Sequence, residues 1–184
     1  EALMGRLRER GVPLGQFAGC KPMYGIKTGL NEAFLIDDAT RVALVRDDPA
    51  CADIIKPYLR GQDIGRWTPD WQGLWMIFAR RGIDIDAYPS VRTYLERLRA
   101  RLEPRPEDWD TKGSGVWPGR KPGRYAWYEI QDSVDYWRMF EQPKILYREI
   151  QFHPQYALSE GPLYGNNKVF LLPTADPYLL AVLN

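Results

Sequence analysis

The sequence predicts an α+β fold, in which strands and helices follow one another without the regular alternation that builds a parallel sheet. Two observations support this prediction. Residues 74–79 and 144–150 are short apolar runs that are typical of strands. The apolar residues of 89–102 instead recur at helical spacing and fall on one face of an amphipathic helix. With 184 residues, 45% of them hydrophobic, we expect one domain with a sizeable core.

The first part of the chain is predicted to combine helices with a hairpin. Residues 3–10 are predicted to form a helix that ends at Gly11, its expected C-cap, and before Pro13. Residues 33–37 and 41–45 are expected to pair as a hairpin. A short helix is expected over residues 48–59, and residues 62–71 form a polar loop. This region therefore supplies at least two strands.

The second part of the chain is predicted to be mixed as well. Its expected elements, beside the strand at 74–79, are a helix at 89–102, an irregular segment at 111–128, a helix at 133–141, and strands at 144–150, near Tyr156 and at 168–172. Two prolines shortly after residue 102 end the long helix.

Both ends of the sequence have the pattern of interrupted helices, so we expect a domain excised from a larger chain. Residues 1–12 are interpreted as a linker helix from an upstream domain. Residues 174–184 are interpreted as the start of a C-terminal helical region. In that region Asp176 is the expected N-cap, and Pro177 takes the first helical position.

The composition limits the classes of function. The net charge of +1 gives no global basic field, so binding to nucleic acid would depend on local patches. Cys20 and Cys51 match no metal or redox spacing, and buried thiols in a reducing compartment are the simplest interpretation. The sequence shows no signal peptide and no apolar run of membrane-spanning length. We therefore expect a soluble cytoplasmic protein with no membrane partner.

The segment 25–34 reads G-I-K-T-G-L-N-E-A-F and is the most informative part of the chain. Lys27, Thr28 and Asn31 place a cation, a hydroxyl and an amide in a tight turn between strand-like residues. The two glycines allow a positive φ or a close backbone approach. Such a turn suits an anion or a base edge, and an ordinary hairpin turn is the alternative. It matches neither a P-loop nor a dinucleotide fingerprint.

Residues 111–128 form a second candidate region, because they combine cations and aromatic rings with flexible backbone and contain no acidic residue. The cations are Lys112, Arg120, Lys121 and Arg124, and the rings are Trp117, Tyr125, Trp127 and Tyr128. This composition suits a loop that follows phosphates and stacks on bases. The alternative is a solvated loop whose rings pack onto the core.

Amides and further arginines provide weaker candidates. Asn166, Asn167 and Lys168 could form a turn whose amides read adenine edges, or a plain turn. The helix arginines at 92, 97, 99 and 101 flank its apolar face and are interpreted mainly as a solvated rim.

The sequence predicts no catalytic residue and no metal site. His153 is the only histidine, and it has no ligand spacing with the two cysteines. Asp110 and Lys112 resemble the end of a restriction-type nuclease site, but they lie between prolines and a glycine-rich loop rather than on a buried strand. Asp84 and Asp86 are expected on the outward face of a short strand.

Several motifs in this order resemble one family. They are the segment 25–34, Ile-Ile-Lys-Pro-Tyr-Leu-Arg-Gly-Gln-Asp-Ile at 54–64, Tyr88-Pro89, Tyr94-Leu95, Trp-Tyr-Glu-Ile-Gln at 127–131, Pro-Lys-Ile at 143–145 and Tyr-Leu-Leu-Ala-Val-Leu-Asn at 178–184. With them the chain resembles the TaqI-like C-terminal specificity domain. This is the target recognition domain of type IIG restriction-modification enzymes and related adenine-N6 DNA methyltransferases.

The resemblance implies that residues 1–184 recognise double-stranded DNA in a sequence-specific way. A methyltransferase domain upstream in the same polypeptide would bind S-adenosylmethionine and methylate a flipped adenine, so no cofactor is expected in this segment. The resemblance also implies a β-helix-like sheet region, with flanking helices and a C-terminal helix that begins where the chain stops. The alternatives are a metal-dependent nuclease fragment that uses Asp110 and Lys112, or an aromatic-rich carbohydrate-binding module.

The resemblance also distributes the candidate DNA-binding residues into two groups. Residues within shared motifs are expected to grip phosphates or hold the scaffold: Lys27, Thr28, Asn31, Arg60, Trp127, Tyr128 and Lys144. Residues in variable parts are expected to read bases: Arg66, Arg120, Lys121, Arg124, Asn166, Asn167 and Lys168.

Overall fold

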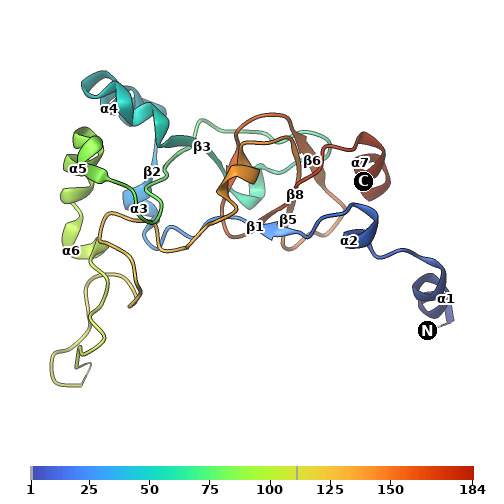
Figure 1. Ribbon diagram of the computed structural model, residues 1–184, viewed down its shortest axis with the longest axis horizontal. Helices are drawn as coiled ribbons and strands as arrows, with labels where there is room; N and C mark the ends of the chain where they lie inside the picture. The colour runs from blue at the N-terminus through green and yellow to red at the C-terminus, as the bar shows by residue number, and fades with distance from the viewer. Residues whose placement is uncertain (1, 111) are drawn as a thin grey trace.

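The computed structural model describes residues 2–110 and 112–184 and confirms an α+β fold (Figure 1). One four-stranded sheet has the order β1-β8-β5-β6, and all of its neighbours are antiparallel. Its strands are β1 (Met23–Tyr24), β8 (Val169–Leu172), β5 (Lys144–Arg148) and β6 (Tyr156–Ser159). Leu146 lies at its centre, opposite Leu171 on one side and Ala157 on the other, and all three are buried.

A second sheet has the order β2-β4-β3-β7. Its strands are β2 (Leu35–Ile36), β4 (Trp75–Ile77), β3 (Ile55–Leu59) and β7 (Tyr164–Gly165). Here β3 and β7 run parallel, whereas the other named strands that the structure describes pair antiparallel. The β-helix-like character implied by the resemblance is therefore limited to that pair and to isolated parallel bridges such as Ile26–Asn166.

The helices gather at the two ends of the molecule, with the sheets between them (Figure 1). One end carries α4 (Asp38–Asp47), α5 (Pro89–Glu96) and α6 (Arg99–Leu102). The other end carries α1 (Ala2–Arg10), α2 (Leu14–Phe17) and α7 (Pro177–Leu183), with both termini. The remaining helical turns are α3 (Asn31–Phe34), η1 (Pro49–Asp53), η2 (Gly61–Asp63), η3 (Ile85–Ala87) and η4 (Trp137–Phe140).

The predicted hairpin of residues 33–37 and 41–45 is wrong. The Asp37 carboxylate accepts a hydrogen bond from the backbone N–H of Thr40 at 2.8 Å and caps α4. This cap satisfies a donor that would otherwise be orphaned, and the chain continues as a helix. The strand β2 that precedes α4 pairs instead with the distant β4.

The helix predicted over residues 48–59 is also mostly wrong. It is limited to η1, and the chain then extends as β3. Pro57 explains the change, because proline lacks the N–H that an α-helix needs and is tolerated in extended backbone. In β3 it lies opposite Trp75.

Two further helices are shorter than predicted. The helix expected at 89–102 is divided into α5 and α6 at residues 97–98, although its apolar face still buries Val91, Leu95 and Leu102. The helix expected at 133–141 is reduced to η4. Asp84 is the N-cap of η3 rather than part of a strand, since its carboxylate accepts from the Asp86 N–H at 3.1 Å.

The C-terminal elements agree with the prediction. Strands occupy 144–148, 156–159 and 169–172, and α7 begins at Pro177 after its N-cap Asp176, whose carboxylate accepts from the N–H groups of Tyr178 and Leu179. The main core lies over the second sheet and one face of the first. A smaller core of Ile145, Leu172, Leu179 and Leu180 joins α7 to the first sheet. Among the described residues, no helix has the length and apolarity to cross a membrane.

Candidate nucleic-acid interface

A polar cleft of about 440 Å³ lies where the 25–34 turn meets four distant segments of the chain. Its lining residues are Ile26, Lys27, Thr28, Gly29, Leu30, Asn31, Tyr58, Lys121, Gln131, Asn166 and Asn167. The fold therefore assembles predicted candidates from the turn, from the 111–128 loop and from the Asn166–Asn167 turn into one site.

The two glycines of the turn are required by its geometry. Gly29 has a φ of +87°, a left-handed conformation that residues other than glycine adopt only with strain. Gly25 lies against other backbone, because a Cβ there would stand 2.0 Å from the Asn166 carbonyl oxygen. The turn is not a hairpin. Ile26 bridges to Asn166 in parallel, and residues 31–34 form α3.

Backbone hydrogen bonds hold the turn against residues 131–132. The Gln131 N–H donates to the Thr28 carbonyl at 3.0 Å, and the Asp132 N–H donates to the Lys27 carbonyl at 3.2 Å. The Lys27 N–H donates to the Asp132 carboxylate at 2.9 Å. The Thr28 side chain is buried, and its hydroxyl donates to the Asn31 Oδ1 at 2.7 Å. Thr28 is therefore a scaffold residue that orients Asn31.

Amide side chains with unused hydrogen-bonding groups line this polar cleft, which we call the amide cleft. Within the part of the chain that the structure describes, no partner is found for the Asn31 Nδ2 or for the side chains of Gln131 and Asn167. The Asn166 Oδ1 accepts from the Lys168 N–H at 3.0 Å, which leaves its Nδ2 without a described partner. An amide offers a donor and an acceptor side by side, the pattern that matches a base edge.

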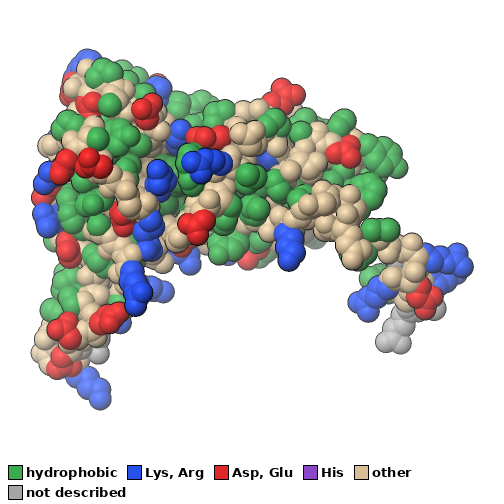
Figure 2. All heavy atoms as spheres, viewed as in Figure 1, with side chains coloured by type: hydrophobic (Ala, Val, Ile, Leu, Met, Phe, Trp, Pro, Cys, Tyr) green, Lys and Arg blue, Asp and Glu red, His purple; other side chains and the backbone are tan. Residues whose placement is uncertain are grey.

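Two exposed lysines, Lys27 and Lys121, add positive charge at the cleft. Neither ammonium group has an ion-pair partner among residues 2–110 and 112–184. The floor is Tyr58, whose burial raises the pKa of its hydroxyl, so it stays neutral. Figure 2 shows Lys and Arg interspersed with Asp and Glu over the visible face, as the net charge of +1 implies. The charge available to an anionic ligand is therefore local.

Arg120 does not read bases in this structure, contrary to the prediction. Its side chain is 4% exposed, and all five of its N–H groups point at backbone carbonyls. Nε donates to Leu102 at 2.6 Å, Nη1 to Thr28 at 3.3 Å and Glu129 at 2.7 Å, and Nη2 to Ala126 at 3.2 Å and Trp127 at 2.9 Å. Burial lowers the pKa of its guanidinium to about 10, which still leaves it charged at neutral pH. Arg120 joins α6, the turn and residues 126–129.

Lys144 likewise belongs to the scaffold rather than to a phosphate contact. It is fully buried, and its Nζ donates to the carbonyls of Phe140 at 2.6 Å, Gly161 at 2.8 Å and Gln142 at 3.1 Å. With the Ser159 Oγ at 3.4 Å, four acceptors surround the three protons of the ammonium group. Burial lowers the pKa of Lys144 to about 8.

Four other predicted cations lie outside the cleft. Arg66 donates to the Asn184 carbonyl at 2.6 Å beside α7. Lys168 pairs with Glu149 at 2.6 Å, and Arg60 pairs with the buried Asp63 at 2.9 Å. Arg124 is exposed, and its carbonyl accepts a hydrogen bond from Arg81. The structure thus separates these residues from the amide cleft.

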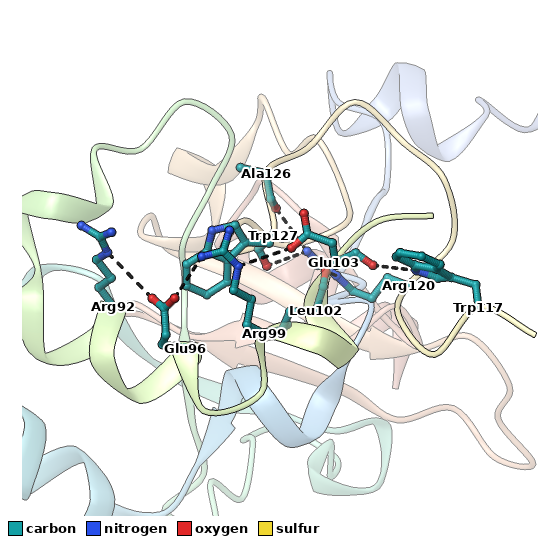
Figure 3. Close-up of polar contacts among 9 residues, drawn as sticks. All are labelled: Arg92, Glu96, Arg99, Leu102, Glu103, Trp117, Arg120, Ala126 and Trp127. Atoms are coloured by element: carbon teal, nitrogen blue, oxygen red, sulfur yellow. Dashed lines mark hydrogen bonds and ion pairs between the residues drawn. The ribbon is translucent and has the colours of Figure 1, made fainter. Parts of the chain in front are cut away.

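The rings of the 111–128 region pack onto the protein rather than standing free, which favours the alternative considered above. Thr111 itself lies outside the described residues. The Trp117 Nε1 donates to the Glu103 carbonyl at 3.0 Å (Figure 3), and Tyr125 is 8% exposed. Trp127 lies edge-to-face with Tyr128 at 5.5 Å, and the Arg99 guanidinium covers it at 4.9 Å.

Most of the helix arginines are engaged in ion pairs, as a solvated rim requires. Glu96 lies 4.0 Å from Arg92 and 3.0 Å from Arg99, and Arg99 is 3.6 Å from Glu103 (Figure 3). Arg101 pairs with Glu32 at 2.6 Å. These pairs neutralise the charge that a phosphate would otherwise meet.

The nuclease alternative gains no support from the geometry. Asp110 and Lys112 are exposed, and the Asp110 carboxylate accepts from the Lys112 backbone N–H at 2.8 Å. Over residues 2–110 and 112–184, no group of three or more His, Cys, Asp or Glu side chains is placed to hold a metal. The Cys51 thiol is buried and donates to the Asp48 carboxylate at 3.0 Å.

Sequence reasoning did not select Tyr58 and Gln131 as site residues. Gln131 closes the Trp-Tyr-Glu-Ile-Gln motif, so its place in that motif was an available signal. Tyr58 lies in the motif at 54–64, but nothing in that motif marks it as a cleft residue, and it reaches the cleft where β3 pairs with β7.

Comparisons with known proteins relate this chain to part of a much longer protein. No family model matches it. The chain is 28% identical over 182 residues to Type II methyltransferase M.PaeR7I of Pseudomonas aeruginosa, a match that covers 95% of this chain and 28% of that protein. It is 26% identical over 186 residues to Type II methyltransferase M.XhoI of Xanthomonas vasicola, covering 99% of this chain and 30% of that protein. The chain therefore spans less than a third of the length of these relatives.

The fold is also similar to part of a solved structure. The type IIL restriction-modification enzyme MmeI, determined in complex with DNA, superposes with a TM-score of 0.55 and 18% identity. The similarity covers 89% of this chain and 20% of that one. At this identity the comparison establishes a shared fold. Together, the two sequence relatives and the shared fold confirm that the chain is related to proteins of DNA modification and restriction-modification.

Proposed function

We propose that this chain is the DNA target recognition segment of a larger adenine-N6 DNA methyltransferase or restriction-modification enzyme of the cytoplasm, as its resemblance to the TaqI-like specificity domain implies. It recognises double-stranded DNA, while an upstream domain of the same polypeptide holds S-adenosylmethionine and methylates the flipped adenine. The observation that carries this proposal is the cleft, where amides and two lysines without partners among the described residues converge from distant segments.

The chemistry of the cleft divides its residues into two functions. Asn31, Gln131 and Asn167 present donor and acceptor groups at fixed positions, as base readout requires. Lys27 and Lys121 supply charge for phosphates without carrying sequence information. Thr28 and Arg120 hold the cleft in shape from below and make no contact with DNA.

The similarity pattern supports a segment that depends on other domains. The relatives are type II methyltransferases, and the matched region is 28% to 30% of their length. The fold neighbour was determined in complex with DNA. A recognition segment accounts for both facts, because it needs a catalytic domain outside the matched region.

The test begins with a randomised library of DNA duplexes. The natural, full-length protein is used to select the duplexes that it binds. We expect one sequence to be enriched. Binding to the enriched duplex, followed by fluorescence anisotropy, should weaken steeply between about 50 and 200 mM salt. Each of Lys27→Ala and Lys121→Ala should reduce the slope of log affinity against log salt by about 1, with the sequence preference unchanged.

The amide variants give the complementary result. Asn167→Ala and Gln131→Ala should relax the preference at single base positions, and each lost base contact corresponds to about 1–3 kcal/mol. Their salt slope should match the wild type. The exposed Arg124→Ala serves as a control for charge removed outside the cleft. Failure to enrich any sequence, or binding that ignores salt, would contradict the proposed function.

A further inference from the structure

The loop between β5 and β6, residues 149–155, exposes two large apolar side chains. Phe152 is 93% exposed and Ile150 is 82% exposed. His153 stands edge-to-face against the Phe152 ring, with the ring centres 4.6 Å apart. Apolar side chains gathered on an exposed surface indicate an interaction site more often than one exposed singly. None of these residues belongs to the amide cleft.

Hydrogen bonds within the loop hold its backbone in a conformation that keeps the two apolar side chains exposed. The Gln151 side chain spans it, because Nε2 donates to the Arg148 carbonyl at 3.2 Å and Oε1 accepts from the Gln155 N–H at 2.8 Å. The amide between the two apolar residues is thereby turned inward. Ile150 and Phe152, on either side of it, remain outside the core.

The root of the loop adjoins the amide cleft. The Glu149 N–H donates to the Lys168 carbonyl at 2.9 Å, and Lys168 follows the two cleft asparagines directly. Gly61, Arg148 and Ile150 line a hollow of about 240 Å³ at this root. Arg148 has no ion-pair partner among the described residues, and its Nε is buried without an acceptor there. The Arg148 guanidinium thus lies at the root of the apolar loop without an ion-pair partner among the described residues.

We propose that this loop is a wedge that inserts Phe152, supported by Ile150, into a base step of the duplex whose edges the cleft reads. The inference rests on the proposed function. Apolar side chains that enter between stacked bases unstack them and bend the duplex. Arg148 grips the phosphate that flanks the opened step, since a guanidinium matches a phosphate in two hydrogen bonds. The wedge and the cleft then engage adjacent parts of one duplex.

The cation at the root favours DNA over a protein as the occupant. A purely apolar protein interface would leave the Arg148 guanidinium without a partner, whereas a base step offers stacking surface and phosphate a few ångströms apart. The braced loop also lowers the conformational cost of insertion, because the tip is already held away from the core.

The test uses the full protein and its selected duplex, with 2-aminopurine placed at successive positions. Wild-type protein should raise 2-aminopurine fluorescence at one base step, where stacking is lost. Phe152→Ala should remove this signal and weaken binding by about 5- to 150-fold, the range for one stacked base. Phe152→Trp should keep both. Because no charge is removed, the salt slope should stay that of the wild type.

Phe17→Ala is the matched control, since Phe17 is 58% exposed on α2 at the end of the molecule that carries the termini. It should alter neither signal. If Phe152→Ala binds the duplex within about twofold of wild type with the same fluorescence, the wedge is disproved while the proposed function stands. A lower melting temperature of Phe152→Ala with unchanged DNA affinity would also disprove it, because the ring would then be covered by protein. Absence of DNA binding by the wild type would instead overturn the proposed function itself.

Discussion

The buried cations and the cleft cations of this protein have the same chemistry but opposite hydrogen-bonding states. Arg120 and Lys144 lie inside the fold, and their N–H groups donate to backbone carbonyls. Lys27 and Lys121 lie at the cleft with no described ion-pair partner. A buried cation whose N–H groups are all hydrogen-bonded has no donor available for a ligand. An exposed cation without a partner can still form an ion pair with one.

This difference shows which basic residues of the proposed recognition segment fix its shape and which lack a partner within the described residues. Arg120 and Lys121 are neighbours in the sequence, yet one supports the turn from below and the other lines the cleft. The comparison can be tested by substitutions that should separate loss of stability from loss of binding.

The largest effect is expected for Arg120→Met. The substitution removes five hydrogen bonds to carbonyls of three segments, and several of those carbonyls become buried acceptors without that donor. We expect the free energy of unfolding to fall by about 3–5 kcal/mol, measured by urea denaturation with tryptophan fluorescence. Arg124→Met, an exposed position in the same loop, should change it by less than about 0.5 kcal/mol. Equal losses in the two variants would mean that burial does not distinguish these arginines.

A smaller loss is expected for Gly25→Ala. Its Cβ would lie 2.0 Å from the Asn166 carbonyl oxygen and 2.4 Å from that of Gly165, so the turn and β7 must separate. The expected destabilisation is about 2–3 kcal/mol, because backbone atoms cannot move aside as a side chain can. The cleft should open at the same time, and DNA affinity should fall with it. Gly5→Ala in α1 is the control, since outside the adjacent residues and the backbone of that helix no atom lies within 4 Å of the added Cβ; a similar loss there would contradict the role of close packing.

The third effect depends on pH and concerns Lys144. Its folded pKa, about 8, is below the ordinary value of 10.5, so the unfolded chain binds more protons between these values. Stability should therefore rise as the pH increases from 8 to 10, by about 2 kcal/mol, because below pH 8 Lys144 is charged in both states and the cost of burying that charge is fully present.

Comparison of wild type with Lys144→Met isolates this contribution. The difference in unfolding free energy between the two proteins, measured by urea denaturation at each pH, should grow in favour of the wild type across that window. A difference that is constant from pH 8 to pH 10 would show that Lys144 keeps an ordinary pKa in the fold. Tyr136, whose pKa burial raises to about 12, titrates above the window in the folded state.

The smallest effect on stability is expected for Lys27→Ala and Lys121→Ala. Both side chains are exposed, so thermal melting and urea denaturation should agree with wild type within about 0.5 kcal/mol. The same variants should bind duplex DNA more weakly at low salt and approach wild-type affinity at high salt. Loss of stability without a change in salt dependence would place these lysines with the scaffold.

Much of the second half of the fold could be predicted, because its signals are local. The apolar runs of β5 and β8 and the Asp176-Pro177 start of α7 each specify their element within a few residues. The hairpin predicted at 33–45 failed because one capping carboxylate, Asp37, outweighed the strand propensity of the valines in α4. The helix predicted to Leu59 failed at Pro57, which is compatible with β3 but not with a helix interior.

The candidate site was predicted in part. Lys27, Asn31, Lys121 and the asparagine pair were selected from sequence and do meet in the cleft. Arg120, selected on the same grounds as Lys121, is buried. Its neighbours in sequence are solvated, so nothing local distinguishes a buried arginine from an exposed one.

The types of polar group, and the positions where glycine allows a sharp turn or a close backbone approach, follow directly from the amino-acid sequence. Those are local properties, set by one residue and its immediate neighbours. Tertiary structure alone decided which polar groups are satisfied and which remain free. That outcome depends on carbonyls and side chains far away in the chain, such as Leu102 for Arg120 and Gly161 for Lys144, because a hydrogen bond forms between groups that the fold brings within about 3 Å.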